Sequence, residues 1–553
     1  MELVFILLSG FIITCTCIIA LEKKKKRQLI KIRNQWGLPK SEYFDFELIE
    51  IYLNANKLPC FHKLTEQTIK DIDLYELFTF IDRTNSSPGQ QYLFDRLIKP
   101  INDINELKLL NTQVTFFKNN QTTREKIQLH LKKLSIKDSY SIAGLLNQNN
   151  FQTPGWLKWL TINLLVALGT LIAFFFYKQA IVAIMLVFAI HLFLHFKNKN
   201  KASLYIRSFP ELIKLIRITE ELVKENIPFD KNNPSKSVKN LSSFRNRFLI
   251  MSFGQTNGDD WSLVVFYFIE LIKAFFLIEI ISFYGIVKCL EDKQKDVQCL
   301  LEFVGRIDAC ISIASLRSGS NNTCEPEFSI NEKALDLKAI YHPLIKNCVA
   351  NSFSIQGKSV LITGSNMSGK SSFLRTIAIN SVLAQSIYTC FAEAYSAPMV
   401  MLGTSILVED NLFEGKSYYF SEVEIMADLL NKAIQANQNL FILDEVFKGT
   451  NTVERIAAGK AILSYLNQNK NLVMVSSHDI ELEELLKDEY DLYHFEEEIQ
   501  NNQLVFDHLL KKGPLQSRNA IKILELKKYP SSVVKEASNL SFRLFHEQNK
   551  KLI

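Results

Sequence analysis

The chain of 553 residues is long enough for two or three domains. Hydrophobic residues make up 47% and charged residues 22%, which excludes an intrinsically disordered chain. The net charge of +6 is concentrated at residues 23–27 and 197–201, beside apolar runs, so it favours membrane flanks over a nucleic-acid surface.

The first apolar run, Leu3–Leu21, has about the length needed to cross a bilayer. Glu2 precedes it and five basic residues follow it, which is the reverse of a secretory signal. Residues 1–21 are therefore predicted to be a transmembrane anchor with the rest of the chain inside, and a cleaved signal is the alternative.

A second apolar block, residues 156–196, is predicted to form a transmembrane hairpin. Its two arms are Trp159–Tyr177 and Ala180–Phe196, and a lysine-rich stretch marks the exit. Three spans place a multi-pass protein in the membrane and its carboxy-terminal domain in the cytoplasm. The apolar segment Leu263–Leu290 contains four charged residues, so it is predicted to be a helix of the core, with a fourth span as the alternative.

Helical patterns dominate the segments on either side of this hairpin. Residues 22–155 and 197–320 are predicted to be the two halves of one helical core domain. Five apolar residues form a helical stripe in the second half: Leu212, Leu215, Ile216, Ile218 and Leu222. The run Ser318–Asn322 predicts a domain boundary, and residues 321–553 alternate strands with helices, as an α/β domain does.

The most specific motif is a phosphate-binding loop between a predicted strand, 359–363, and a predicted helix, 373–378. The loop and the start of the helix supply the predicted nucleotide-binding residues: Gly364, Ser365, Asn366, Met367, Ser368, Gly369, Lys370, Ser371 and Ser372. Glycines let backbone N–H groups approach phosphate oxygens at a helix N-terminus. Lys370 is predicted to reach the β- and γ-phosphates of ATP, and Ser371 to bind Mg²⁺.

Two further strands end in polar residues that suit the same chemistry. The apolar run 440–443 ends at Asp444 and Glu445, and the run 471–477 ends at His478. Asp444 is predicted to hold Mg²⁺. Glu445 is predicted to act on the attacking water, as a general base or as an orienting group, and His478 to sense the γ-phosphate.

As a set, these motifs resemble the MutS family of ATPases within the wider ABC-type group. The Asn-Met pair of the loop, the segment Asp410–Glu422, the run Asp444–Thr452, Ser476–Asp479 and His342-Pro343 are similar to motifs of that family. The resemblance implies a homodimer in which Ser417 contacts the nucleotide of the opposite subunit. It also implies a carboxy-terminal helix-turn-helix near 529–537 and a core domain opening near 80–100.

The sequence also departs from the family. It has no segment similar to the amino-terminal mismatch-reading domain, and Cys348-Val349 stands where an aromatic residue often stacks on adenine. The predicted fold is multidomain α and α/β: a membrane-anchored helical core (lever) domain followed by an ABC-type P-loop α/β ATPase domain.

The predicted function is a membrane-anchored, MutS-like ATPase that hydrolyses ATP with Mg²⁺ in a dimer and drives lever motion. One alternative is a membrane-tethered, DNA-binding ATPase related to mismatch repair or recombination, with DNA as its partner. A second alternative is an ABC-type transporter component.

Overall fold

The computed structural model describes residues 2–146, 157–225, 227–228, 234–242, 271–272, 274–329, 333–365, 367–407, 418–435, 438–500, 503–515 and 520–551. These residues form two compact units. The first comprises Met1–Pro59, Ile81–Arg96 and Leu109–Gly319, and the second comprises Cys60–Phe80, Leu97–Lys108 and Ser320–Ile553. The first unit is helical, and both sheets of the chain's described part lie in the second.

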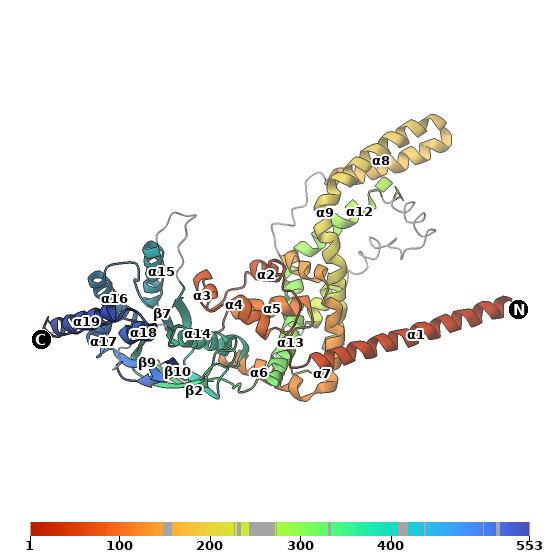
Figure 1. The fold of residues 1–553 in the computed structure, drawn as a ribbon. Helices are drawn as coiled ribbons and strands as arrows, with labels where there is room; N and C mark the ends of the chain where they lie inside the picture. The colour runs from red at the N-terminus through yellow and green to blue at the C-terminus, as the bar shows by residue number, and fades with distance from the viewer. Residues whose placement is uncertain are drawn as a thin grey trace. The chain divides into compact units, whose positions relative to one another are not determined.

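The first unit is built from α-helices and short 3₁₀ turns (Figure 1). In chain order its helical elements are α1 (Glu2–Gln35), α2 (Phe46–Ala55), most of α5 (Ser87–Ile98) and of α6 (Ile104–Asn119), α7 (Gln121–Leu131), η1 (Lys132–Leu134), η2 (Lys137–Leu146), α8 (Leu157–Phe176), η4 (Lys178–Ala180), α9 (Ile181–Val223), α12 (Ile278–Glu291) and α13 (Gln294–Gly319). Helix α12 covers the second part of the helix predicted at Leu263–Leu290 and ends one residue later, while most of the first part falls outside the described residues.

Helix α13 is the centre of this unit and packs beside α9. It is buried continuously from Val304 to Leu316 except for one half-buried position, as expected of a helix that neighbours surround. The five apolar residues of the predicted stripe on α9 are all buried, which confirms their role in core packing. Where α13 ends, Gly319 lies so close to Gly37 that a Cβ there would sit 1.8 Å from the Gly37 carbonyl oxygen.

The apolar block forms a helical hairpin, in which α8 packs against the first part of α9. Leu160, Ala167 and Val187 are buried there, and His191 Nδ1 lies 2.5 Å from the carbonyl oxygen of Phe275. Other apolar side chains of the hairpin face outward, among them Leu165, Phe175, Phe176, Met185 and Phe193. In Figure 1 the hairpin projects away from the rest of the first unit.

The prediction of membrane spans at 1–21, Trp159–Tyr177 and Ala180–Phe196 is wrong. Crossing a bilayer takes about 20 consecutive apolar residues in one helix. No helix within the described residues contains a stretch that is long and apolar enough. In α1 and α9 the apolar run passes without a break into lysine-rich turns of the same helix. The predicted multi-pass membrane location, with a cytoplasmic ATPase domain, is withdrawn together with these spans.

The second unit contains two sheets. The smaller has four strands in the order β1-β5-β2-β3: β1 (Glu327–Phe328), β5 (Ala394–Ala397), β2 (Ala334–Ile340) and β3 (Asn351–Gln356). The larger has six in the order β10-β9-β4-β8-β7-β6: β10 (Gln503–Lys512), β9 (Tyr490–Gln500), β4 (Ser359–Thr363), β8 (Leu472–Ser476), β7 (Asn439–Asp444) and β6 (Met401–Ser405). All neighbours in the larger sheet are parallel except the antiparallel hairpin β9–β10.

Helices connect these strands, as parallel strands require. They are α14 (Lys370–Ile387), α15 (Tyr418–Ala433), α16 (Thr452–Leu466) and α17 (Ile480–Leu486), and the chain closes with α18 (Ala520–Leu526) and α19 (Ser531–Lys551). The short helix α3 (Glu66–Asp71) and nearly all of α4 (Leu74–Ile81) belong to the same unit. Strands β4, β7 and β8 are buried along their length because helices cover the sheet, so they read in sequence as unbroken apolar runs.

Candidate active site

The predicted site residues meet at one edge of the larger sheet. Strands β4, β8 and β7 are neighbours, and the cross-strand register places Ile362 opposite Ser476 and Ser476 opposite Asp444. Because the strands are parallel, their carboxyl ends lie side by side, and the loop at Gly364, the pair Asp444–Glu445 and His478 follow those three ends. In open α/β sheets this edge is where ligands bind.

The loop after β4 has a backbone that needs glycine at two positions. Gly364 has φ of 146° and Gly369 of 115°, both in the region that side chains disfavour. A Cβ on Gly364 would lie 2.7 Å from the carbonyl oxygen of Phe495, so the close approach also excludes a side chain there. Met367 adopts φ of 71° and is 84% exposed, while Asn366 lies outside the described residues.

Lys370 begins α14 and turns back over the loop. Its ammonium donates to the carbonyl oxygens of Gly364 at 2.8 Å and Ser365 at 2.9 Å, and it lies 3.3 Å from His478 Nε2. Burial lowers the pKa of Lys370, and the carboxylates of Glu445 and Asp444 act in the opposite direction. The Lys370 ammonium is therefore held by the loop, beside His478 and close enough to Glu445 and Asp444 to feel their charges.

Asp444 connects two strands and the helix start through its two oxygens. Ser371 Oγ donates to Oδ2 at 2.5 Å, and Ser476 Oγ donates to Oδ1. A serine hydroxyl and a carboxylate are oxygen ligands of the kind Mg²⁺ uses when phosphates and waters complete its shell. Ser371 and Asp444 thus fit a site with few protein ligands; within the described residues, no cluster of three or more acidic, histidine or cysteine side chains could hold a metal by itself.

Glu445 sits in a strained turn directly after β7. Its φ is 57°, and its N–H donates to the carbonyl oxygen of Ser476 at 3.1 Å. Its carboxylate accepts from His478 Nε2 at 2.9 Å and lies 3.4 Å from Lys448 Nζ. Burial acts to raise the pKa of Glu445, but the bond from His478 and the charge of Lys448 hold it at about 2. In this arrangement Glu445 is a charged acceptor and a weak base.

His478 is itself held by an ion pair next to it in the chain. Arg455 on α16 donates to both oxygens of Asp479, from Nε at 2.9 Å and from Nη2 at 2.6 Å. A two-pronged bond of this kind restricts orientation as well as distance. The pair therefore limits the movement of the turn that carries His478.

A cavity of about 390 Å³ opens beside the loop. Four of the predicted site side chains, Ser365, Lys370, Ser371 and Glu445, line it. The rest of the lining is Ile340, Ile345, Lys346, Asn347, Cys348, Val349, Asn351, Met367, Gly369, Ser372, Phe373, Thr376, Phe495 and His508. Cys348 and Val349 do lie in this lining, where they present small side chains.

The β9–β10 hairpin also contacts the loop, and the sequence carried no signal for this. Glu497 Oε2 accepts from Ser365 Oγ at 2.6 Å, and His508 Nδ1 lies 3.0 Å from the carbonyl oxygen of Ser368. Phe495 packs edge-on against Phe373 behind the loop, with ring centroids 5.8 Å apart. Because these residues lie more than 120 positions after the loop and match no motif, only the sheet order brings them to the site.

The segment predicted to contact an opposite subunit lies mostly outside the described residues, and Ser417 is among those not described. Its last residue, Glu422 on α15, is described and buried. Glu422 accepts a hydrogen bond from the N–H of Phe447, in the turn that follows Glu445.

Comparison with known proteins gives a consistent result for this unit. The model of MutS domain V matches residues 360–544. A DNA mismatch repair protein MutS from Listeria welshimeri is 31% identical over 291 residues, which is 50% of this chain and 33% of that protein. One from Oceanobacillus iheyensis is 28% identical over 270 residues, 46% of this chain and 30% of that protein. The chain thus aligns with about a third of the length of these relatives.

Proposed function

Because the chain belongs to the MutS family, we propose that it is a P-loop ATPase that binds ATP with Mg²⁺ and hydrolyses it. The observation that carries this proposal is the meeting of Lys370, Ser371, Asp444, Glu445 and His478 at the carboxyl ends of adjacent strands, beside a cavity of about 390 Å³.

The loop and Lys370 bind the phosphates in this proposal. Backbone N–H groups of residues 364–369 and the start of α14 face the phosphate oxygens. The Lys370 ammonium exchanges its bonds to Gly364 and Ser365 for the β- and γ-phosphates. Ser371 and Asp444 would hold Mg²⁺, which when bound would neutralise phosphate charge.

Glu445 and His478 act on the other side of the γ-phosphate. A carboxylate whose pKa is about 2 holds little affinity for a proton, so Glu445 orients the attacking water by accepting a hydrogen bond from it. His478, which donates to Glu445, adjusts that acceptor as the γ-phosphate arrives. The proposal therefore gives Glu445 the orienting role and not the general-base role.

The active form in this proposal is a homodimer. Ser417 of each chain completes the site of the other, so that ATP joins the two subunits and hydrolysis releases them. Closure then drives motion of the helical core domain. Residues 321–553 serve as the ATPase domain, with a carboxy-terminal helix-turn-helix formed by α18 and α19 pairing the subunits.

The relatives named above are DNA mismatch repair proteins, so action on DNA is the second candidate function. Phosphate contacts weaken steeply with salt, so duplex binding that falls as salt rises would support this candidate. A turnover rate that duplex DNA does not change would count against it.

The test of the ATPase proposal is phosphate release by the purified full-length chain with ATP and Mg²⁺. Lys370→Ala is expected to remove turnover and to weaken ATP binding. Lys358→Ala, which changes a half-buried lysine just before β4 that donates to the carbonyl oxygen of Lys487, is the matched control and should hydrolyse ATP at the unmodified rate. Equal turnover in the chain with and without Lys370 would overturn the proposal.

A further inference from the structure

The first unit contains a second cavity, of about 320 Å³, that the proposed ATPase activity does not use. Three parts of the first unit surround it. They are the end of α1 and the segment after it, the start of α5, and the residues of α7 and η1. Its lining comprises Lys31, Ile32, Gln35, Trp36, Leu38, Pro39, Lys40, Glu42, Tyr43, Phe44, Arg83, Thr84, Asn85, Ser86, Ser87, Gln90, Gln128, Lys132, Ser135, Tyr140 and Ser315.

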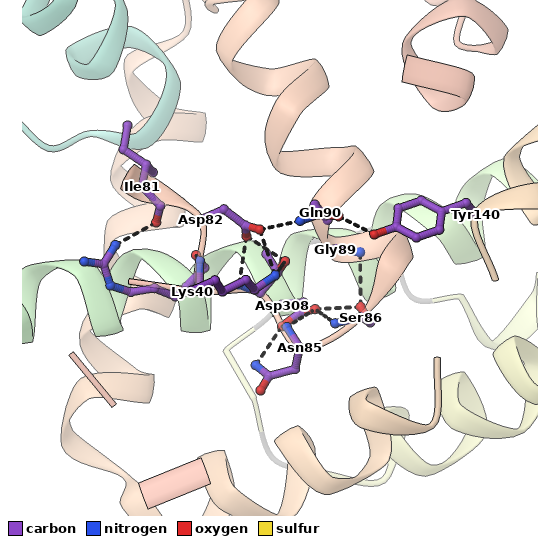
Figure 2. Close-up of polar contacts among 12 residues, drawn as sticks. Lys40, Ile81, Asp82, Asn85, Ser86, Gly89, Gln90, Tyr140 and Asp308 are labelled. Carbon is purple, nitrogen blue, oxygen red and sulfur yellow. Dashed lines mark hydrogen bonds and ion pairs between the residues drawn. The ribbon is translucent and has the colours of Figure 1, made fainter. Parts of the chain in front are cut away.

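Two buried carboxylates beside this cavity are satisfied by the protein itself (Figure 2). Asp308 accepts from the backbone N–H groups of Asn85 and Ser86 and from Ser86 Oγ, at 2.9, 2.7 and 2.6 Å. Asp82 accepts from Lys40 at 2.7 Å and from Gln90 at 2.6 Å. Since these acids are paired, they hold the cavity wall in place and do not repel an anion strongly.

The lining is strongly cationic. Lys31, Lys40, Lys132 and Arg83 contribute to it, and Glu42 is the one acidic residue among its described members. Burial lowers the pKa of Lys132, the charges of Lys31 and Lys40 lower it further, and the charge of Glu42 acts in the opposite direction. Burial also lowers the pKa of Arg83, to about 10. An anion in the cavity would relieve this repulsion between like charges.

Aromatic rings complete the lining. Trp36, Tyr43, Phe44 and Tyr140 all contribute to it. Arg124 stacks on Trp36, with its guanidinium carbon 3.5 Å from the ring centroid, and so fixes the indole. Tyr140 OH donates to Gln90 Oε1, which fixes the phenol ring. Rings held in this way suit a flat heteroaromatic ligand.

We propose that this cavity binds one free nucleotide, with its phosphate among Lys31, Lys132 and Arg83 and its base against the aromatic rings of the lining. A phosphate accounts for the excess of cations, and a planar base accounts for the aromatic side chains. The site lies wholly within the first unit and is separate from the phosphate loop.

The test is equilibrium dialysis of radiolabelled AMP against the full-length chain carrying Lys370→Ala, which disables the phosphate loop. We expect one AMP per chain. Adenosine and inorganic phosphate, which each carry half of the recognised chemistry, should compete at least about ten-fold less well. Lys31→Gln with Lys132→Gln should weaken AMP binding about ten-fold or more.

The matched control is Lys133→Gln, an exposed lysine next to Lys132 that does not line the cavity. It should bind AMP as the parent does, and circular dichroism should show that every variant is folded. No AMP bound, or binding that the Lys31 and Lys132 substitutions leave unchanged, would overturn the proposal. A 5′-phosphorylated oligonucleotide that competes better than AMP would also overturn the proposal, because the cavity would then bind the phosphorylated end of a nucleic-acid strand.

Discussion

The carboxylate of Glu422 accepts a hydrogen bond of 2.5 Å from the backbone N–H of Phe447. Glu422 lies on α15 and is the last residue of the segment predicted to contact another subunit, and Phe447 lies two residues after Glu445. Both Glu445 and Phe447 have positive φ, 57° and 61°, so this turn is strained and needs outside support. The contact therefore joins the predicted dimer segment to the residue proposed to orient water.

Replacing Glu422 should lower ATP turnover while ATP binding is kept. Glu422→Ala removes the acceptor that holds the turn, and a misplacement of about 1 Å at Glu445 costs up to about a hundred-fold in rate. We therefore expect kcat to fall about ten- to a hundred-fold with a nearly unchanged Kd for ATP. Asp428→Asn, at an exposed position of the same helix, is the control. A loss of ATP affinity that equals the loss of rate would contradict this role.

Neutralising Glu445 should separate binding from hydrolysis. Glu445→Gln keeps the size of the side chain but weakens its bond to water and to His478. We expect turnover to fall about a hundred-fold or more and an ATP-bound dimer to accumulate. Light scattering during size-exclusion chromatography with ATP measures the dimer. Asp488→Asn, an exposed acid in the same unit, should leave both turnover and mass unchanged. A monomeric, fully active Glu445→Gln chain would refute the assignment.

Ser371 should set the Mg²⁺ requirement. Its hydroxyl and the Asp444 carboxylate, 2.5 Å apart, supply the predicted metal oxygens. Ser371→Ala is expected to raise the Mg²⁺ concentration for half-maximal turnover by about ten-fold, while Ser371→Thr, which keeps the hydroxyl, should stay close to the unmodified chain. Titrating Mg²⁺ at saturating ATP measures this effect. The same Mg²⁺ midpoint for serine, threonine and alanine would exclude Ser371 as a ligand.

Acid should destabilise the second unit through His342. Burial, with a smaller contribution from Arg375, lowers the pKa of His342 to about 4, and Nδ1 accepts from the N–H of Leu344 at 3.3 Å. Between about pH 6.5 and 4 the unfolded chain binds a proton that the folded chain does not, so stability falls as the pH falls.

This loss should reach up to about 3 kcal/mol for His342 alone. His342→Asn keeps an acceptor near Leu344 but does not titrate, so its free energy of unfolding should depend less on pH in this window. Denaturant unfolding at pH 7 and pH 4.5 gives the comparison. Equal acid sensitivity in both chains would show that other groups, such as the buried His62, carry the effect.

Asp308 should be essential for the stability of the first unit. Its buried carboxylate accepts hydrogen bonds from Asn85 and Ser86, and a Cβ on Gly89 would lie 2.2 Å from its Oδ2. Asp308→Asn turns an NH₂ group toward these donors, so we expect a loss of about 3 kcal/mol in the free energy of unfolding. Asp296→Asn on the same helix, whose contact to Asn240 is exposed, should change it by less than about 0.5 kcal/mol. Similar losses in both variants would contradict this account.

Local patterns in the sequence determined much of the second unit. The predicted strand 359–363 is β4, and the apolar runs before Asp444 and His478 are β7 and β8, because fully buried parallel strands read as unbroken apolar segments. The loop after β4 could also be predicted from the sequence, because Gly364 and Gly369 adopt positive φ angles that residues with side chains disfavour. Family membership followed from these same motifs.

Only the tertiary structure decided which distant segments contact the site and whether the apolar helices could cross a membrane. The order of strands in the sheet places Glu497 and His508 against the loop. The fold also brings Glu422 to the backbone N–H of Phe447. These residues are too far apart in sequence for a local pattern to predict their contacts. The spans predicted from hydropathy were wrong because no helix among the described residues contains a stretch that is long and apolar enough to cross a bilayer.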